Sequence, residues 1–162
     1  MKKVVDTVQE CTANNFIHVS EVELRYKSKV KPSERPVVKT SKEAYAVLLK
    51  NWDENKIEYV EQFKILLLNR AHRVLGIFEL STGGQSGTVA DPKLIFIAAL
   101  KTSATSIILA HNHPSSNLKP SRADEELTKK IKAGGALLKI IVIDHLIISP
   151  EGYYSFADEG LM

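Results

Sequence analysis

Cysteine is almost absent from this sequence, which has one, Cys11, among its 162 residues. A single cysteine cannot form an intrachain disulfide, so the fold must depend on a hydrophobic core, as is usual in a reducing compartment. A structural zinc site is disfavoured for the same reason, because such a site is closed by four protein ligands that are mostly cysteine.

Long apolar runs are also missing. No stretch approaches the ~20 apolar residues of a membrane helix, and the start, MKKVVDTVQECTANN, lacks the apolar run of a signal peptide. We therefore expect a cytoplasmic protein with no membrane association.

The net charge of +3 is too small to identify a nucleic-acid binder by itself. A local basic stretch is typical of a solvated helix face and consists of Lys129, Lys130, Lys132 and Lys139.

The apolar pattern predicts one mixed α/β domain with a curved sheet, and we assign residues 1–39 to an N-terminal extension. Residues 22–26 of the extension alternate as a half-exposed strand does. One helix is expected to begin at residue 41, after a Thr40–Glu43 capping box, and a second to cover residues 92–101. A third is expected over residues 121–132, ended by Gly134 and Gly135. Expected strands cover 62–69 and 74–80 as a hairpin, then 106–110, 138–143, 145–149 and 153–156.

Two histidines, His111 and His113, stand two residues apart after the apolar segment SIILA. Alternate side chains of an extended backbone share a face, so both can reach one cation. Pro114 favours that extended backbone at His113. Asp124, eleven residues after His113, can supply a third ligand. Two histidines and one carboxylate leave a fourth tetrahedral position for water, which is the arrangement of catalytic zinc.

Asp124 also has a second interpretation, because Ser121 and Asp124 have the spacing of a helix capping box. The two roles are compatible if Ser121 caps the helix and Asp124 turns its carboxylate to the metal. A metal hydrolase also needs a general base. Glu79 is the candidate, since a carboxylate in the apolar segment VLGIFEL is costly unless it has a partner or a function. The alternative for Glu79 is a strand-end residue that faces water.

A third histidine, His145, follows Asp144 at the end of the apolar segment LLKIIVI. It can be a metal ligand, a hydrogen-bonded core histidine, or a support for the ligands. These three alternatives stay open, and so does the role of Asp144.

Together these residues resemble the metal motif of the JAMM (JAB/MPN) metalloproteases: Glu, then His-x-His, seven residues of which the first is proline, Ser, two residues and Asp. The segments GTVADPKLIFIAAL, HNHPS, PSRAD, DHLIIS and YYSFADEGL are similar to the RadC branch of that family, over about residues 40–162. The resemblance implies a cytidine deaminase-like fold and one Zn²⁺ per chain. The residues it implies are His111, His113 and Asp124 as ligands, Glu79 as general base, and Ser121 as donor to the developing oxyanion.

The chain departs from the RadC pattern in two places. RadC chains usually begin with a helix-hairpin-helix region that binds DNA, and residues 1–39 show no such hairpin. The motif loop usually reads His-Pro-Ser-Gly, whereas Ser116 takes the glycine position here. Glycine reaches positive φ more cheaply than serine, so this change concerns the loop backbone and not the ligands.

Two functions follow as hypotheses. The first is a zinc-dependent metallopeptidase or isopeptidase acting on a peptide or protein that the sequence does not identify. The second is a factor of DNA repair or of mobile elements, with a nuclease or non-catalytic role. The modest charge and the missing hairpin count against tight DNA binding, and the complete ligand set counts against a non-catalytic role. The oligomeric state is not fixed by the sequence.

Overall fold

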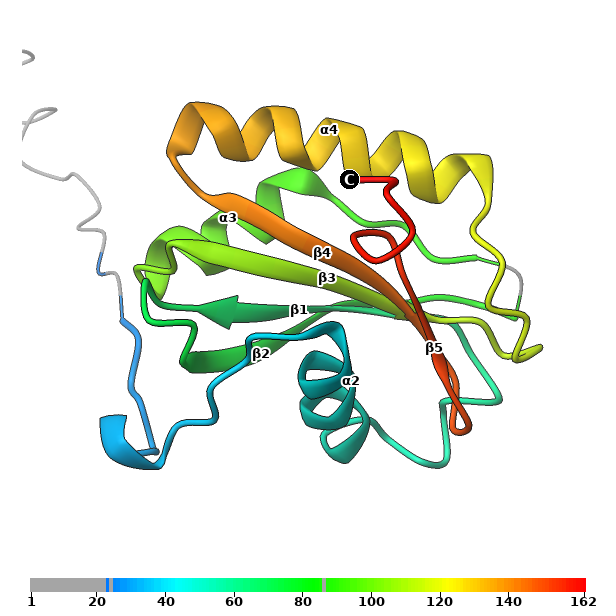
Figure 1. Ribbon diagram of the computed structural model, residues 1–162, viewed down its shortest axis with the longest axis horizontal. Coiled ribbons are helices and arrows are strands. Elements are labelled where there is room, and N and C mark those ends of the chain that lie inside the picture. The colour runs from blue at the N-terminus through cyan, green and yellow to red at the C-terminus, as the bar shows by residue number, and fades with distance from the viewer. Residues whose placement is uncertain (1–22, 24, 86) are drawn as a thin grey trace, which may run out of the picture.

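The computed structural model describes residue 23, residues 25–85 and residues 87–162. Five strands form one sheet in the order β2-β1-β3-β4-β5 (Figure 1). The strands are β1 (Gln62–Leu68), β2 (Val74–Thr82), β3 (Ser106–Asn112), β4 (Ile141–Ile148) and β5 (Tyr153–Ser155), and the helices are η1 (Pro32–Glu34, 3₁₀), α2 (Ser41–Lys50), α3 (Pro92–Lys101) and α4 (Arg122–Leu138). Strands β3 and β4 are parallel and the other neighbours antiparallel. The expected mixed α/β fold is confirmed.

Helices cover the two faces of the sheet unequally (Figure 1). Helix α2 packs on one face, where its Ala44 and Leu48 meet alternate residues of β1 such as Leu66 and Leu68. Helices α3 and α4 pack on the other face against the intervening β1 residues, including Phe63 and Ile65. Each central strand therefore buries both of its faces, which explains why β1 and β3 read as continuous apolar runs.

The local signals of the first half of the domain are confirmed. Thr40 accepts a hydrogen bond from the Glu43 amide, and the Glu43 carboxylate accepts one from the Thr40 amide, which completes the capping box of α2. Strands β1 and β2 form the predicted antiparallel hairpin. Helix α3 begins with Pro92 behind the capping side chain of Asp91.

The predicted end of α4 is wrong, because the helix passes through Gly134 and Gly135 and ends at Leu138. Both glycines are places of close approach. A Cβ on Gly134 would lie 2.8 Å from the ring of Phe96, and a Cβ on Gly135 would lie 2.4 Å from the carbonyl oxygen of Ile140. Strand β4 consequently starts at Ile141, later than predicted, and it runs without a break through His145 to Ile148.

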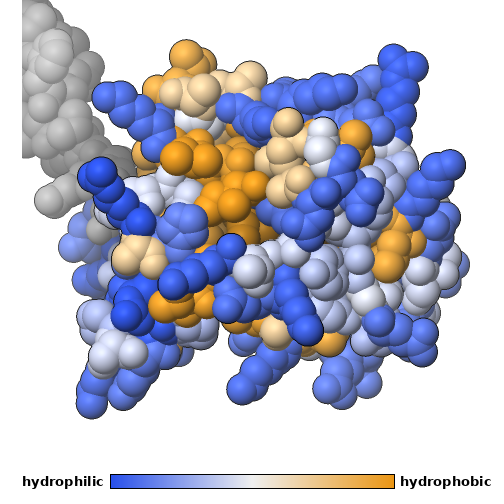
Figure 2. All heavy atoms as spheres, viewed as in Figure 1, coloured by the Kyte–Doolittle hydropathy of each residue, from blue (hydrophilic) through white to orange (hydrophobic). Residues whose placement is uncertain are grey.

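Figure 2 shows an apolar area beside α2, where no helix lies over that face of the sheet. Ile143 of β4 packs on this side of the sheet. Ile141, at the start of the same strand, is 66% exposed. No helix among the described residues is long and apolar enough to cross a membrane. The strand predicted over residues 22–26 falls partly outside the described residues, and the described ones, 23, 25 and 26, belong to no strand. Cys11 lies outside the described residues.

Candidate metal centre

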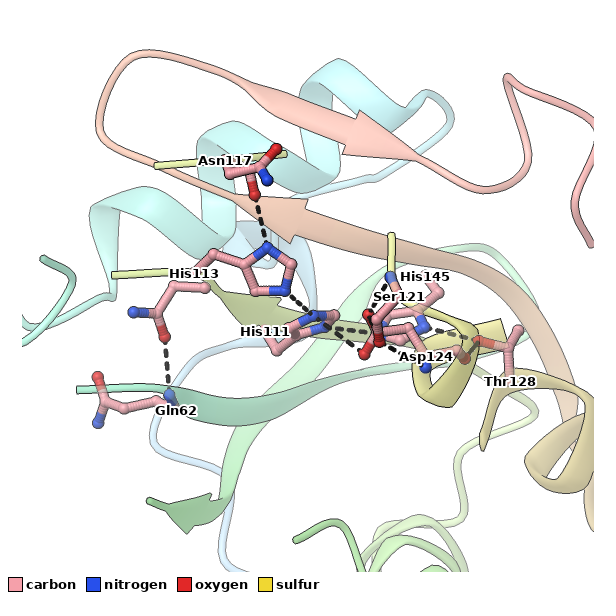
Figure 3. Close-up of polar contacts among 9 residues, drawn as sticks. Gln62, His111, His113, Asn117, Ser121, Asp124, Thr128 and His145 are labelled. Carbon is pink, nitrogen blue, oxygen red and sulfur yellow. Dashed lines mark hydrogen bonds and ion pairs between the residues drawn. The ribbon is translucent and has the colours of Figure 1, made fainter. Parts of the chain in front are cut away.

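Strand β3 continues to Asn112, so His111 is a strand residue and His113 follows directly after the strand. The two side chains share a face, and their Nε2 atoms lie 3.0 Å apart (Figure 3). The carboxylate of Asp124 approaches from α4, with Oδ1 at 3.3 Å from Nε2 of His111. The structure thus brings together the three residues that the sequence nominates as ligands.

The geometry of this cluster fits a tetrahedral cation. One ligand atom from each of His111, His113 and Asp124 lies within 4.8 Å of the others. Zinc–ligand bonds of about 2.0–2.1 Å at tetrahedral angles place neighbouring ligand atoms about 3.3 Å apart. The separations of 3.0 and 3.3 Å are close to that value. Two histidines and a carboxylate are also the ligand types of a catalytic zinc site.

Asp124 caps the helix with one carboxylate oxygen and directs the other at the histidines. Its Oδ2 accepts hydrogen bonds from the Ser121 amide at 2.7 Å and the Ser121 hydroxyl at 2.6 Å. Ser121 Oγ in turn accepts from the Asp124 amide, which completes a capping box at the start of α4. Oδ1 remains directed at His111. The helix cap therefore holds Asp124 in the orientation that a ligand needs.

The loop after β3 fixes the ring of His113. The carbonyl oxygen of Asn117 lies 2.5 Å from Nδ1 of His113. A carbonyl can only accept, so Nδ1 carries the proton and the Nε2 lone pair faces the cluster. Ser116 has a φ of 57°, so the backbone there does adopt the left-handed conformation that glycine would take more cheaply.

Burial keeps the central histidine neutral. His111 is 1% exposed. Removal from water lowers its pKa to about 4, although the Asp124 carboxylate acts in the opposite direction. At neutral pH the ring therefore has a lone pair to offer a cation.

The structure does not bring Glu79 to this cluster. Glu79 lies opposite Lys64 in the β1–β2 pair, and its carboxylate is 3.2 Å from the Lys64 ammonium. The Lys64 ammonium sits 4.5 Å from the centre of the Trp52 ring, on the α2 face of the sheet. His111 projects from the opposite face, where its ring stacks on Phe63. Glu79 thus has the partner that its apolar strand requires, and that partner is not the metal site.

Glu61 occupies the place that Glu79 was expected to take, and sequence reasoning missed it. It immediately precedes β1 and lines a cavity together with His113, Ser121 and Asp124. Burial raises the pKa of its carboxyl group; of its two neighbours, His113 acts to lower that pKa and Asp124 acts to raise it. The register of β1 against β3 pairs Phe63 with His111, so the next residue on the same face of the chain is Glu61. That register was the only signal that could have identified it.

Asn112, between the two histidines, holds the segment that carries Glu61. Its side-chain nitrogen donates to the carbonyl oxygens of Ile57 at 2.6 Å and Val60 at 2.8 Å. Its oxygen accepts from the Gln62 amide at 2.7 Å. Glu61 is therefore clamped by bonds to both of its chain neighbours, from a residue that is itself fully buried.

Asp144 and His145 are neighbours on β4, and their side chains lie on opposite faces of the sheet. His145 lies behind the cluster, with Nε2 at 2.9 Å from Nδ1 of His111, so it contacts a candidate ligand and is not one of the three residues grouped around the metal position. Asp144 accepts instead from Ser155 and from the amide of Ala157, which ties β4 to the C-terminal segment.

Comparison with known proteins agrees with this geometry. The model of the RadC-like JAB domain matches residues 38–161. The chain belongs to the RadC-like JAB domain family. A UPF0758 protein of Flavobacterium johnsoniae is 48% identical over 101 residues, which are 62% of this chain and 44% of that protein. A UPF0758 protein of Thermosynechococcus vestitus is 39% identical over 130 residues, which are 79% of this chain and 50% of that protein.

This RadC-like chain spans half or less of the length of these curated relatives. The matched segment contains His111, His113 and the start of α4. The shared part is thus the JAB domain that carries the candidate metal centre.

Proposed function

We propose that this RadC-like JAB domain is a zinc-dependent hydrolase that cleaves peptide or isopeptide bonds. The observation that carries the proposal is the convergence of His111, His113 and Asp124 beside a half-buried carboxylate, Glu61, in one cavity. The cation proposed for this His–His–carboxylate set is zinc, with one ion per chain. When bound there, zinc lowers the pKa of a coordinated water towards ~7 and polarises a carbonyl group.

Glu61 is the general base of this proposal. Its carboxylate shares the cavity with the three ligands, and burial brings its pKa closer to neutrality than that of an exposed glutamate. It takes a proton from the attacking water and passes it to the nitrogen that leaves. A glutamate whose pKa is raised performs both transfers better than a fully solvated one.

Ser121 is proposed as the donor to the developing oxyanion. It lines the cavity, and its hydroxyl proton is directed at Asp124 Oδ2 before a substrate binds. The Ser121 amide also donates to that oxygen, so Asp124 keeps one hydrogen bond when the hydroxyl turns to the oxyanion.

The metal ligands are tested with the purified 162-residue chain supplied with zinc. The wild type is expected to retain one zinc per chain, and Asp124→Ala to lose it because a ligand is missing. Glu126→Ala is the matched control, since Glu126 lies on the same helix but pairs with Arg122 at the surface. Equal zinc in all three proteins, or none in the wild type, would remove the basis of the proposal.

The kind of bond is tested on two substrate sets, short peptides including isopeptides joined through lysine, and single- and double-stranded DNA. Cleavage of peptides that stops with a chelator and returns with zinc supports the proposal. Cleavage of DNA alone would favour the alternative role as a DNA-associated nuclease. The cavity contains two carboxylates, Glu61 and Asp124, which makes it a poor site for a phosphate backbone without added cations.

A further inference from the structure

Behind His111 a line of hydrogen bonds runs away from the metal position into the core. Nδ1 of His111 lies 2.9 Å from Nε2 of His145, and Nδ1 of His145 lies 2.7 Å from Oγ1 of Thr128 (Figure 3). Thr128, on α4, is bonded to the carbonyl oxygen of Asp124 at 2.6 Å. His145 and Thr128 are fully buried, so no water competes for these bonds.

The direction of every bond in this line follows from its last acceptor. A backbone carbonyl cannot donate, so the Thr128 hydroxyl must give its proton to Asp124. The same oxygen can then only accept from His145, which places the His145 proton on Nδ1. In a neutral ring this leaves a lone pair on Nε2, and that lone pair accepts the Nδ1 proton of His111. The remaining nitrogen of His111, Nε2, then carries no proton, and its lone pair is directed at His113 and Asp124.

The polar character of residue 145 is not explained by packing. The His145 ring stacks on Phe156 with centroids 4.7 Å apart and lies 5.6 Å from Phe63. A phenylalanine would fill such an aromatic site without burying two nitrogens, which costs free energy unless both are hydrogen-bonded. The side chain at this position therefore has a use beyond its volume.

We propose that Thr128 and His145 are positioning residues that hold His111 in the tautomer with its lone pair on Nε2, ready to bind a cation. The proposal rests on the proposed function, since the cation gives that tautomer its purpose. His113 receives the equivalent constraint from the Asn117 carbonyl. The two ligands thus reach the same state by different routes, one through a loop and one through the core.

The first test reads the tautomers directly in the metal-free 162-residue chain, by ¹⁵N NMR of the imidazole rings at neutral pH. In the wild type, His111 and His145 are both expected to carry their proton on Nδ1. In Thr128→Val, which has nearly the same shape but no hydroxyl, His145 loses its acceptor. The Nε2-protonated form of His145 then becomes available, and it forces a proton onto Nε2 of His111. Thr128→Ser keeps the hydroxyl and is expected to retain the wild-type tautomers.

The second test is zinc affinity, measured by competition with a chelating dye. Loss of a hydrogen-bonded support typically weakens metal binding, so Thr128→Val is expected to bind zinc roughly 10- to 100-fold more weakly. Thr128→Ser should stay within about threefold of the wild type, because it preserves the donor and acceptor. A role confined to packing would make serine, the smaller residue, the worse of the two.

A wild-type spectrum with the His111 proton on Nε2 overturns the proposal, and it does so even if Thr128→Val fails to fold. Equal zinc affinity in the valine and serine variants overturns it as well. The proposed hydrolase fails separately, through a wild type that holds the expected tautomers and binds zinc yet cleaves no peptide.

Discussion

Two glutamates at the same end of the β1–β2 hairpin have opposite environments. Glu61 faces the histidines, and burial raises the pKa of its carboxyl group. Glu79 lies on the other face; burial also acts to raise its pKa, but the Thr82 hydroxyl and the Lys64 ammonium outweigh that and hold the pKa below its usual range. One carboxylate is left able to take up a proton, and the other is held ionised by its partners. A carboxylate in an apolar strand is thus as readily explained by a structural partner as by catalysis.

The largest expected difference between the two glutamates is in catalysis, and it is tested by neutralising each in turn. Glu61→Gln removes the proposed base and is expected to lower kcat by about 10²- to 10⁴-fold, while zinc binding persists. Glu79→Gln, the matched control, removes a carboxylate that does not line the cavity and should leave kcat within about threefold of the wild type. Peptide cleavage by both zinc-loaded variants is the measurement. The reverse ranking would return the role of base to Glu79.

The two glutamates also show which parts of the candidate site can be predicted from the sequence. The candidate ligands His111, His113 and Asp124 were predictable because their geometry is local: the two histidines share a face of extended chain at the end of β3, and Asp124 stands in a capping box. The hairpin and the start of α2 were predictable for similar reasons.

Features that depend on tertiary contacts were not predictable. Glu61 reaches the site through the register between β1 and β3, which no single segment encodes. The link from Thr128 to His145 joins α4 to β4 across the core. Gly134 and Gly135 resemble a helix stop in the sequence, which does not show the close approach of Phe96 and Ile140 that requires glycine there.

The position of Glu61 can be disturbed without touching its carboxylate. Asn112→Ala leaves two buried carbonyls and one amide without their partner, and should lower the free energy of unfolding by about 2–3 kcal/mol. Because the segment bearing Glu61 is then released, kcat should fall by roughly tenfold or more in protein that remains folded.

Asn69→Ala is the control for that change. Asn69 also accepts from two backbone amides, but in the turn at the opposite end of the hairpin. It should cost less than about 1.5 kcal/mol and leave kcat unchanged. Urea unfolding and peptide cleavage of both variants decide the matter. A catalytic loss of equal size in Asn69→Ala would show that Asn112 acts only through overall stability.

The smallest expected effect concerns stability and its dependence on pH in the metal-free protein. A carboxyl group whose folded pKa is lowered stabilises the fold above its unfolded pKa, about 4.3, and this contribution is lost as the pH falls through the folded value. Glu79→Gln should therefore destabilise the chain at neutral pH, by less than about 1 kcal/mol because the side chain is partly exposed. The difference from the wild type should shrink on acidification.

Glu61 has the opposite sign, because its raised pKa means that the folded state disfavours its ionised form above the unfolded pKa. Glu61→Gln should consequently stabilise the metal-free chain slightly at neutral pH, and this gain should also vanish as the pH falls below about 4.3. Urea unfolding of both variants at several pH values measures the two signs. If both substitutions shifted stability in the same direction, the two carboxylates would not differ in environment as the structure indicates. If Glu61 is a catalytic base whose burial destabilises the fold, the two substitutions should change the free energy of unfolding in opposite directions. Only Glu61→Gln, the variant that gains stability, should then lose activity.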